Sequence, residues 1–317
     1  MTLWTSDDIP RLDGRLAIVT GTGGLGFQTA QALARAGADV ILAGRNEQSG
    51  QSAIAEIKRE MAHASVRFSR LDLARLASIA AFAERMRSEH DRIDLLINNA
   101  AVMTPPRRLT TSDGFELQFG TNYLGHFALT AQMLPLLRKG RDARIVTVSS
   151  VAARGADIDF SDLQAELAYR PSVSYGQSKL AQLAFALELQ RRSDAAGWNI
   201  TSVAAHPGIS RTDLLHKGPG RWSGPGLARS LLPFLFQPAA QGALPTLFAA
   251  TSPEAKGGGY YGPDKLLETR GHPKSAKIPE RAFDRDAATE LWIRSEHLIG
   301  MSFAPVNDLP VALRRVG

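Results

Sequence analysis

Residues 16–26 read LAIVTGTGGLG, in which a run of apolar residues is followed at once by a glycine-rich turn. The run LAIVT predicts a buried strand, and the amphipathic segment 27–36 after the turn predicts a helix. Glycine lets the backbone turn tightly and approach a phosphate group, and a helix N-terminus presents free N–H groups and a positive dipole end. A plain strand–helix turn rarely needs four glycines in six positions. We therefore predict that this turn binds the pyrophosphate of a dinucleotide through Gly21, Thr22, Gly23, Gly24, Leu25 and Gly26.

Strand and helix signals alternate along the first two-thirds of the chain. Near-continuous apolar runs predict strands that are covered on both faces, and amphipathic stretches between them predict helices. The predicted strands are residues 16–20, 39–43, 66–71, 93–98, 144–149 and 199–205, and the predicted helices include 76–89, 112–137 with a bend near Gly125, and 174–195. This alternation predicts an α/β fold with a doubly wound parallel sheet in a single domain that spans residues 1–317.

The sequence changes character after residue 207. Residues 209–240 mix glycine and proline with leucine, tryptophan and phenylalanine, which predicts a helical lid over a substrate. Residues 263–317 form a C-terminal extension in which 263–283 is predicted to be a surface loop. A helix over 242–250, a short strand at 260–262, and a helix over 284–299 that is capped by Asp284 complete the prediction.

Composition excludes several classes of protein. The chain has no cysteine, which rules out disulfides, cysteine-ligated metal and thiol catalysis, and no metal-ligand spacing is visible. The net charge of +6 comes from scattered basic residues without aromatic interleaving, so we predict an anionic small ligand rather than nucleic acid. The N-terminus carries charge where a signal peptide needs an apolar stretch, and the apolar region 227–250 is interrupted by arginine and proline. We expect a cytoplasmic protein without a membrane anchor.

The residues after the second predicted strand indicate which dinucleotide binds. NAD sites place a carboxylate there for the ribose 2′-OH, whereas NADP sites place a basic group for the 2′-phosphate. This chain reads Ala43-Gly44-Arg45-Asn46 there, with no acid at the tip of the strand, so NADP(H) is preferred over NAD. The alternative for Arg45 is a solvated surface arginine. Asp72, beside Leu73, either contacts the adenine or caps the following helix.

Further motifs resemble the short-chain dehydrogenase/reductase family, with its Rossmann-like fold, over about residues 13–213. The resemblance rests on the glycine turn, NNAA at 98–101, Asn122, Ser149-Ser150, the YGQSK motif at 175–179, and Pro207-Gly208. The longer stretches GFELQFGTNYLGHFALT, DIDFSDLQAE and YGQSKLAQLAFALEL are similar to the retinol dehydrogenase-like branch. The glycine loop is one residue shorter than the usual family loop, which removes a polar side chain that can help to hold a 2′-phosphate.

The resemblance implies a role for each residue of the site. Ser150 would hydrogen-bond the substrate oxygen, Asn122 would hold a water that links Lys179 to solvent, and Lys179 would grip the nicotinamide ribose. Thr212 would bind the nicotinamide amide, or alternatively cap a helix. The implied cofactor-binding set also contains Asn99, Ala100, Pro207 and Gly208.

Tyr175 and Lys179 lie at i and i+4 of one predicted helix, so both point from one face. Free tyrosine is a poor base, and we expect the Lys179 ammonium to lower the pKa of Tyr175, which would then transfer the proton. The sequence thus predicts an NADP-dependent alcohol dehydrogenase or carbonyl reductase for an apolar or aromatic substrate, with Trp222 and Phe234 of the lid facing the pocket. The alternatives are a C=C reductase of the same family and a catalytically silent NADP sensor. The family also implies a homodimer or homotetramer.

Overall fold

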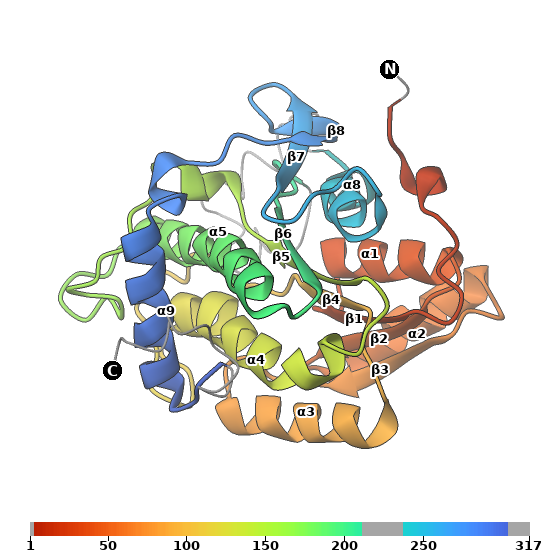
Figure 1. Cartoon of the computed structure of the whole chain (residues 1–317), viewed down its shortest axis with the longest axis horizontal. Coiled ribbons are helices and arrows are strands. Elements are labelled where there is room, and N and C mark those ends of the chain that lie inside the picture. The colour runs from red at the N-terminus through yellow and green to blue at the C-terminus, as the bar shows by residue number, and fades with distance from the viewer. Residues whose placement is uncertain (1–2, 211–236, 304–317) are drawn as a thin grey trace.

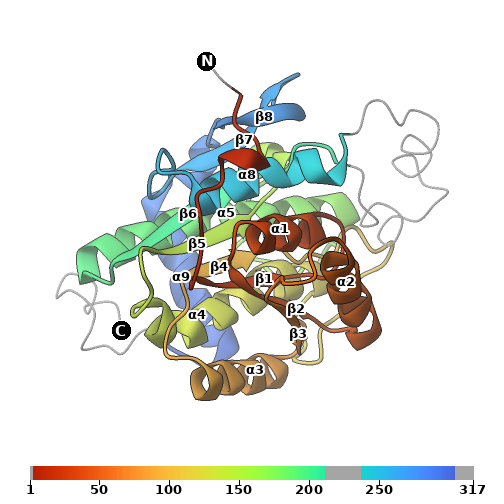
Figure 2. The ribbon, with the colours of Figure 1, turned by 90° about the vertical axis from the view of Figure 1, so that its right-hand side faces the viewer.

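The computed structural model describes residues 3–210 and 237–303, and its centre is one eight-stranded sheet. The strand order is β3-β2-β1-β4-β5-β6-β7-β8, and all pairs are parallel except β7–β8. The β7–β8 hairpin lies at one end of the sheet and β3 at the other (Figures 1 and 2). The strands are β1 (Leu16–Thr20), β2 (Asp39–Gly44), β3 (Val66–Arg70), β4 (Leu95–Asn98), β5 (Ala143–Val148), β6 (Ile200–Ala205), β7 (Tyr260–Lys265) and β8 (Arg270–Ser275).

Helices cover both faces of the sheet (Figure 1). One face carries α1 (Gly24–Arg35), α2 (Glu47–Glu60) and α8 (Ala239–Thr251), and the other carries α3 (Leu76–Glu89), α4 (Gly125–Leu137) and α5 (Pro171–Ala196). The helix α9 (Arg285–Ile299) packs outside this second layer. The doubly wound parallel sheet that the sequence predicts is therefore confirmed.

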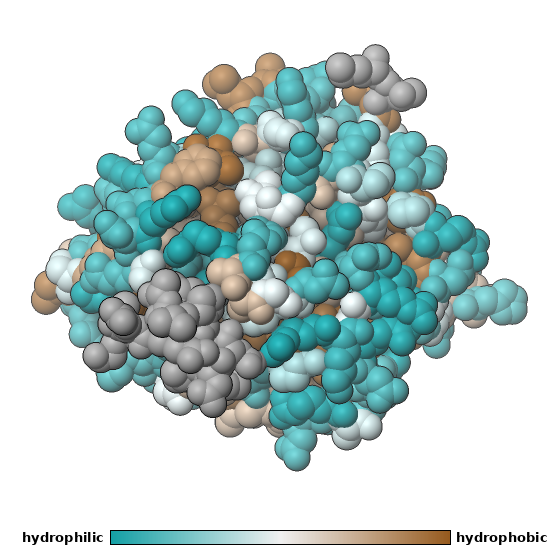
Figure 3. Space-filling model, in the orientation of Figure 1, coloured by the Kyte–Doolittle hydropathy of each residue, from teal (hydrophilic) through white to brown (hydrophobic). Residues whose placement is uncertain are grey.

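Successive residues of a strand pack into the cores on opposite faces of the sheet, because side chains alternate across a sheet. In β1, Ile18 belongs to the core under α3, α4 and α5, whereas Ala17 and Val19 belong to the core under α1, α2 and α8. The first core is aromatic: Trp292 of α9 lies 4.5 Å from Phe303 and 5.0 Å from Phe127 between ring centroids. Hydrophilic residues cover most of the face shown in Figure 3. None of the described helices is long and apolar enough to cross a membrane.

The long predicted helix over residues 112–137 is interrupted where the bend was expected. A π-helical segment, η2 (Phe119–Leu124), precedes α4, which begins at Gly125. A Cβ on Gly125 would lie 2.4 Å from the carbonyl oxygen of Leu73, so glycine is needed where this helix meets the loop after β3. Irregular helical turns of this kind are common at functional sites.

The prediction of a surface loop over 263–283 is wrong. Residues 270–275 form β8, which pairs antiparallel with β7 and places Pro273 opposite Pro263. The sequence RGHPKS lacks the apolar alternation of a buried strand because β8 is an edge strand, where proline is tolerated. The helix cap at Asp284 is confirmed, since its carboxylate accepts hydrogen bonds from the N–H groups of residues 286 and 287. Most of the predicted lid over 209–240 lies outside the described residues.

Candidate active site

The glycine turn lies where the strand order reverses, between β1 and β4, which is the usual ligand position in such sheets. Gly21 and Gly24 adopt φ of 93° and 52°, which other residues rarely reach. Gly23 caps α1 without a side-chain hydrogen bond, so the donors at the helix N-terminus are left for a ligand. A Cβ on Gly26 would lie 2.2 Å from the carbonyl oxygen of Gly21, so only glycine lets the helix approach the strand this closely.

A cavity of about 380 Å³ opens beside this turn, at the carboxyl ends of β1 to β4. Eleven of the predicted cofactor-binding residues line it, and they come from four separate turns. They are Gly21, Thr22, Gly23, Gly24, Leu25, Arg45, Asn46, Asp72, Leu73, Asn99 and Ala100. Gly26 lies behind the turn, and Thr212 lies outside the described residues. The donor set and the close glycine backbone fit a dinucleotide.

The predicted 2′-phosphate side of the cavity has one exposed basic group. Arg45 is exposed, and no hydrogen bond or ion pair joins it to another described residue. Asn46 has a local task, since its Oδ1 caps α2 by accepting from the N–H of Ser49 at 2.8 Å. A Cβ on Gly44 would lie 2.7 Å from the Cγ2 of Thr22, so a larger residue at this strand end would crowd the cavity.

Asp72 does not cap a helix, so that alternative is wrong. Its carboxylate accepts from the N–H of Ala74 at 3.0 Å, and α3 begins later, with Arg75 as its N-cap residue. The N–H of Leu76 in the first turn is satisfied by Asp113 at 2.9 Å. Asp72 therefore remains at the cavity wall.

A hydrogen-bond bridge joins the ends of β1 and β4 under the cavity. The hydroxyl of Thr20 accepts from the N–H groups of Asn99 (2.9 Å) and Ala100 (3.0 Å), and the Asn99 amide donates to the Thr20 carbonyl at 2.7 Å. Asn99 thus fixes the glycine turn with its side chain while it lines the cavity. The family resemblance predicted its place but not this bond.

The structure brings the four predicted catalytic residues together. Ser150 interacts with the Tyr175 hydroxyl, and the Lys179 Nζ lies 5.7 Å from the centre of the Tyr175 ring. The Asn122 amide donates to the hydroxyl of Ser178 at 3.0 Å, which ties η2 to α5 beside Lys179. Ser150 follows the end of β5, Asn122 lies in η2, and Tyr175 and Lys179 lie in α5, so each group is held by a regular element of the fold.

Burial sets the charges of the Tyr–Lys pair, and here the sequence-based expectation is wrong. Desolvation raises the pKa of Tyr175 to about 12, and the hydrogen bond with Ser150 offsets only part of this effect. Desolvation also lowers the pKa of Lys179 to about 7. Lys179 donates to the Val148 carbonyl at 3.0 Å and to Gln182 Oε1 at 2.7 Å rather than to Tyr175. Tyr175 is therefore a proton donor at neutral pH.

His126 is a member of this site whose role the sequence did not reveal. Its Nδ1 lies 2.7 Å from the Asn122 carbonyl and must donate to it, and its Nε2 lies 2.9 Å from the Thr20 hydroxyl. Burial lowers the pKa of His126 to about 4, so the ring is neutral and accepts at Nε2. His126 therefore braces the π-helical turn of Asn122 against the end of β1. Its position four residues after Asn122 was the only sequence signal.

Pro207 and Gly208 follow β6 and are held from below by the β7–β8 hairpin. Gly208 has a φ of 61°, and a Cβ there would lie 2.2 Å from the Thr269 carbonyl oxygen. The N–H of Ile209 donates to the same oxygen at 2.8 Å. The hairpin thus fixes the segment that the family resemblance assigns to the cofactor.

Comparison with known proteins agrees with this geometry. The family model described as short chain dehydrogenase matches residues 15–219. The chain is 41% identical to the polyprenol dehydrogenase of Mus musculus over 299 residues (92% of this chain, 86% of that protein) and 40% identical to its retinol dehydrogenase 13 over 301 residues (92% and 86%). A crystal structure of an uncharacterized protein from Mycobacterium paratuberculosis is 38% identical, with a TM-score of 0.79, and covers 96% of this chain and 100% of that one.

Proposed function

This chain belongs to the short-chain dehydrogenase/reductase family, in its retinol dehydrogenase-like branch, and on that premise we propose that it moves a hydride between NADP(H) and an apolar alcohol or carbonyl compound. The proposal depends on one observation: Tyr175 lies close to both Ser150 and Lys179 in a fold with a cavity that is lined by the glycine turn and Arg45. A silent cofactor sensor would not need an intact proton donor of this kind.

The residues support the following mechanism. When bound, the nicotinamide supplies the hydride for reduction or accepts it for oxidation. The Ser150 hydroxyl holds the substrate oxygen, and Tyr175 donates its proton to that oxygen as the carbonyl carbon is reduced. In the reverse direction Tyr175 takes the proton of the alcohol only as its deprotonated tyrosinate form, so that direction needs the phenol to lose its proton first. Lys179, whose Nζ donates to the Val148 carbonyl and to Gln182, would hold the nicotinamide ribose.

NADP(H) rather than NAD(H) is proposed because of Arg45. A guanidinium can form a two-pronged contact with a phosphate, and the end of β2 and the next two residues, Arg45 and Asn46, hold no acid to bind a 2′-hydroxyl. Arg45→Ala should weaken NADPH by about 1.5–3 kcal/mol and leave NADH nearly unchanged. Arg59→Ala, an exposed arginine on α2, is the matched control. An equal loss for both cofactors in Arg45→Ala would assign Arg45 a structural role.

An apolar substrate is proposed from two considerations. The names of the relatives, polyprenol dehydrogenase and retinol dehydrogenase 13, point to apolar alcohols as their substrates. The segment 209–240 supplies the apolar residues that we expect to cover the substrate, and each buried methylene is worth about 0.8 kcal/mol. A homologous series of ketones should show kcat/KM rising with chain length until the pocket is full. A preference for small charged substrates would reject this part of the proposal.

The decisive experiment is a panel of alcohols, aldehydes and ketones followed by NADPH absorbance, with Tyr175→Phe beside wild type. We expect wild-type turnover and a loss of roughly 10²-fold or more in kcat for Tyr175→Phe. Tyr261→Phe is the control, because its side chain belongs to the core under α1, α2 and α8 and its hydroxyl accepts the N–H of Lys256 at 2.9 Å. NADPH binding without any turnover would favour the sensor, and reduction of only the C=C bond of an unsaturated ketone would favour the C=C reductase.

A further inference from the structure

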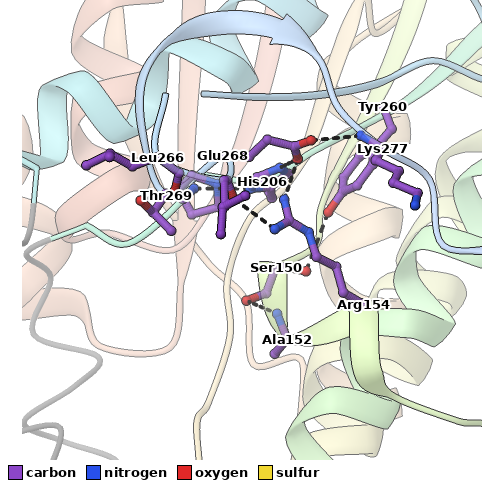
Figure 4. Close-up of polar contacts among 12 residues, drawn as sticks. Ser150, Ala152, Arg154, His206, Tyr260, Leu266, Glu268, Thr269 and Lys277 are labelled. Atoms are coloured by element: carbon purple, nitrogen blue, oxygen red, sulfur yellow. Dashed lines mark hydrogen bonds and ion pairs between the residues drawn. The ribbon is translucent and has the colours of Figure 1, made fainter. Parts of the chain in front are cut away.

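Three charged or titratable side chains from distant parts of the chain meet behind the site (Figure 4). His206 follows β6 and is fully buried, and its Nε2 lies 3.0 Å from Glu268 Oε2. Arg154, in the short helix η3 (Val151–Gly155), donates to the same oxygen at 2.5 Å. The backbone N–H of Lys277 donates to Glu268 Oε1 at 3.0 Å. Both carboxylate oxygens of Glu268 are therefore used by donors from three separate segments.

The protonation state of this cluster follows from its hydrogen bonds. His206 Nδ1 accepts the N–H of Gly208 at 3.2 Å, so the proton of the neutral ring is on Nε2 and is donated to Glu268. Burial lowers the pKa of His206 and keeps the ring neutral. Burial alone would raise the pKa of Glu268, but the bonds from His206 and Lys277 and the Arg154 charge bring it to about 2. Glu268 is thus a carboxylate over the whole working pH range.

The backbone that carries Glu268 is in an unfavourable conformation. Leu266, Leu267 and Glu268 have φ of 48°, 56° and 63°, a region that residues other than glycine seldom occupy. The leucine side chains are 68% and 86% exposed, so apolar burial of these two residues does not offset the strain. What the turn achieves is the inward placement of Glu268, and Arg154 secures it further by donating to the Leu267 carbonyl at 2.8 Å.

Arg154 and His206, side-chain partners of Glu268, lie in segments that also hold residues of the proposed site. Ser150 is the N-cap residue of η3, and its hydroxyl accepts from the N–H of Ala152 in the helix that contains Arg154. His206 immediately precedes Pro207 and bonds Gly208. A Cβ on Gly262 would lie 2.0 Å from His206 Nε2, so the hairpin is shaped around this ring.

We propose that Glu268 is a positioning residue of the dehydrogenase reaction, which holds the Ser150 turn and the Pro207-Gly208 segment in register through Arg154 and His206. The inference rests on the proposed function. The two contacts of Glu268, with Arg154 and with His206, explain why this carboxylate is placed on a strained turn at the sheet edge. Through them Glu268 couples Ser150, which holds the substrate oxygen, to the Pro207-Gly208 segment expected beside the nicotinamide. Glu268 hydrogen-bonds Arg154 and His206 but neither Ser150 nor Gly208, and it takes no part in proton transfer.

The test compares Glu268→Gln with wild type. An amide has one acceptor oxygen and no charge, so it cannot serve Arg154, His206 and Lys277 together. We expect kcat to fall about tenfold or more, while the Kd of 2′,5′-ADP, which needs only the cavity beside Arg45, stays within twofold. Glu280→Gln changes an exposed glutamate whose side chain has no hydrogen bond or ion pair with any described residue; it is the control and should keep wild-type kcat.

Two further variants separate positioning from general destabilisation. Arg154→Gln removes the Arg154 bonds to Glu268 and to the Leu267 carbonyl and leaves the Glu268–His206 bond, so it remains informative if Glu268→Gln does not fold. Because both changes act through one contact, the kcat of the double variant should match that of Glu268→Gln rather than the product of the two losses. A product of losses would overturn the proposal.

Amide hydrogen exchange gives a readout that needs no turnover. In Glu268→Gln, peptides covering 150–155 and 206–210 should exchange at least tenfold faster, with no change in peptides from α2 or α3. Unchanged exchange together with a kcat within twofold of wild type would overturn the inference. If wild type shows no turnover with any substrate but exchange accelerates as expected, the proposed function fails while the positioning contact stands.

Discussion

Gly26→Ala is the sharpest test of why the glycine turn has its sequence. The new Cβ would lie 2.2 Å from the Gly21 carbonyl oxygen, whereas ordinary contacts begin near 3.4 Å, so the helix has to move by about 1 Å. The obstacle is a backbone atom whose strand is fixed in the sheet, so we take the upper end of the overpacking range, about 3 kcal/mol. Alanine regains about 1 kcal/mol of helix propensity. The free energy of unfolding should therefore fall by about 2 kcal/mol, roughly thirtyfold in the folding equilibrium.

The assay is urea unfolding of the cofactor-free protein, with Gly155→Ala as the matched control. Gly155 has negative φ, and nothing lies within 4 Å of the position of its Cβ, so we expect a change within about 0.5 kcal/mol. Gly26→Ala should also weaken NADPH, because the turn that it displaces forms the cavity wall. A Gly26→Ala protein as stable as wild type, or an equal loss in Gly155→Ala, would refute the close-approach argument.

Three other outcomes follow from buried groups. The pKa of Lys179 is about 7 in the folded protein and about 10.4 in the unfolded chain, so the unfolded chain binds more protons between these pH values. The free energy of unfolding should therefore rise with pH in this range. Urea midpoints measured from pH 7 to 9 should rise less steeply in Lys179→Met than in wild type. Since the pKa of Tyr175 is about 12, kcat/KM for alcohol oxidation should increase across pH 6 to 10 while carbonyl reduction does not, and an oxidation rate that falls with pH would contradict the assignment. Asp94 is fully buried and accepts from the N–H groups of Leu16 (2.7 Å) and Arg141 (2.6 Å), so Asp94→Ala should lower the free energy of unfolding by about 3 kcal/mol, measured by thermal and urea unfolding.

The features that the sequence predicted well depend on neighbouring residues. Strand and helix alternation is a local pattern, and the turn at 21–26 carries its own signature, so the sheet and the cavity could be expected. The match of the eleven lining residues to the predicted set has the same origin, since each lies within a few residues of the end of a strand. Tyr175 and Lys179 share one helix, and their common face follows from its period.

The features that were missed depend on residues distant in the sequence. Glu268 meets His206 62 positions away and Arg154 114 positions away, and nothing in the segment KLLETR indicates either partner. The strand β8 has no apolar alternation because its pairing with β7, not burial, forms it. The pKa error for Tyr175 has a similar cause: proximity of a lysine can be read from i, i+4 spacing, but the desolvation of both groups depends on the packing of the whole fold.

The β7–β8 hairpin supports residues of the proposed site that lie in earlier parts of the chain. The ends of β1 to β5 and helix α5 supply the cavity, Ser150, Tyr175 and Lys179 before residue 205 is reached. Yet Gly208 rests on the Thr269 carbonyl, His206 pairs with Glu268, and the Tyr260 hydroxyl donates to the Ser150 carbonyl at 3.4 Å. These supports all come from residues 260–269, which the parallel β6–β7 pairing brings to the same edge of the sheet. Because a site needs its reacting groups held within fractions of an ångström, the edge hairpin belongs to the reaction geometry as much as the strands that carry the reacting groups.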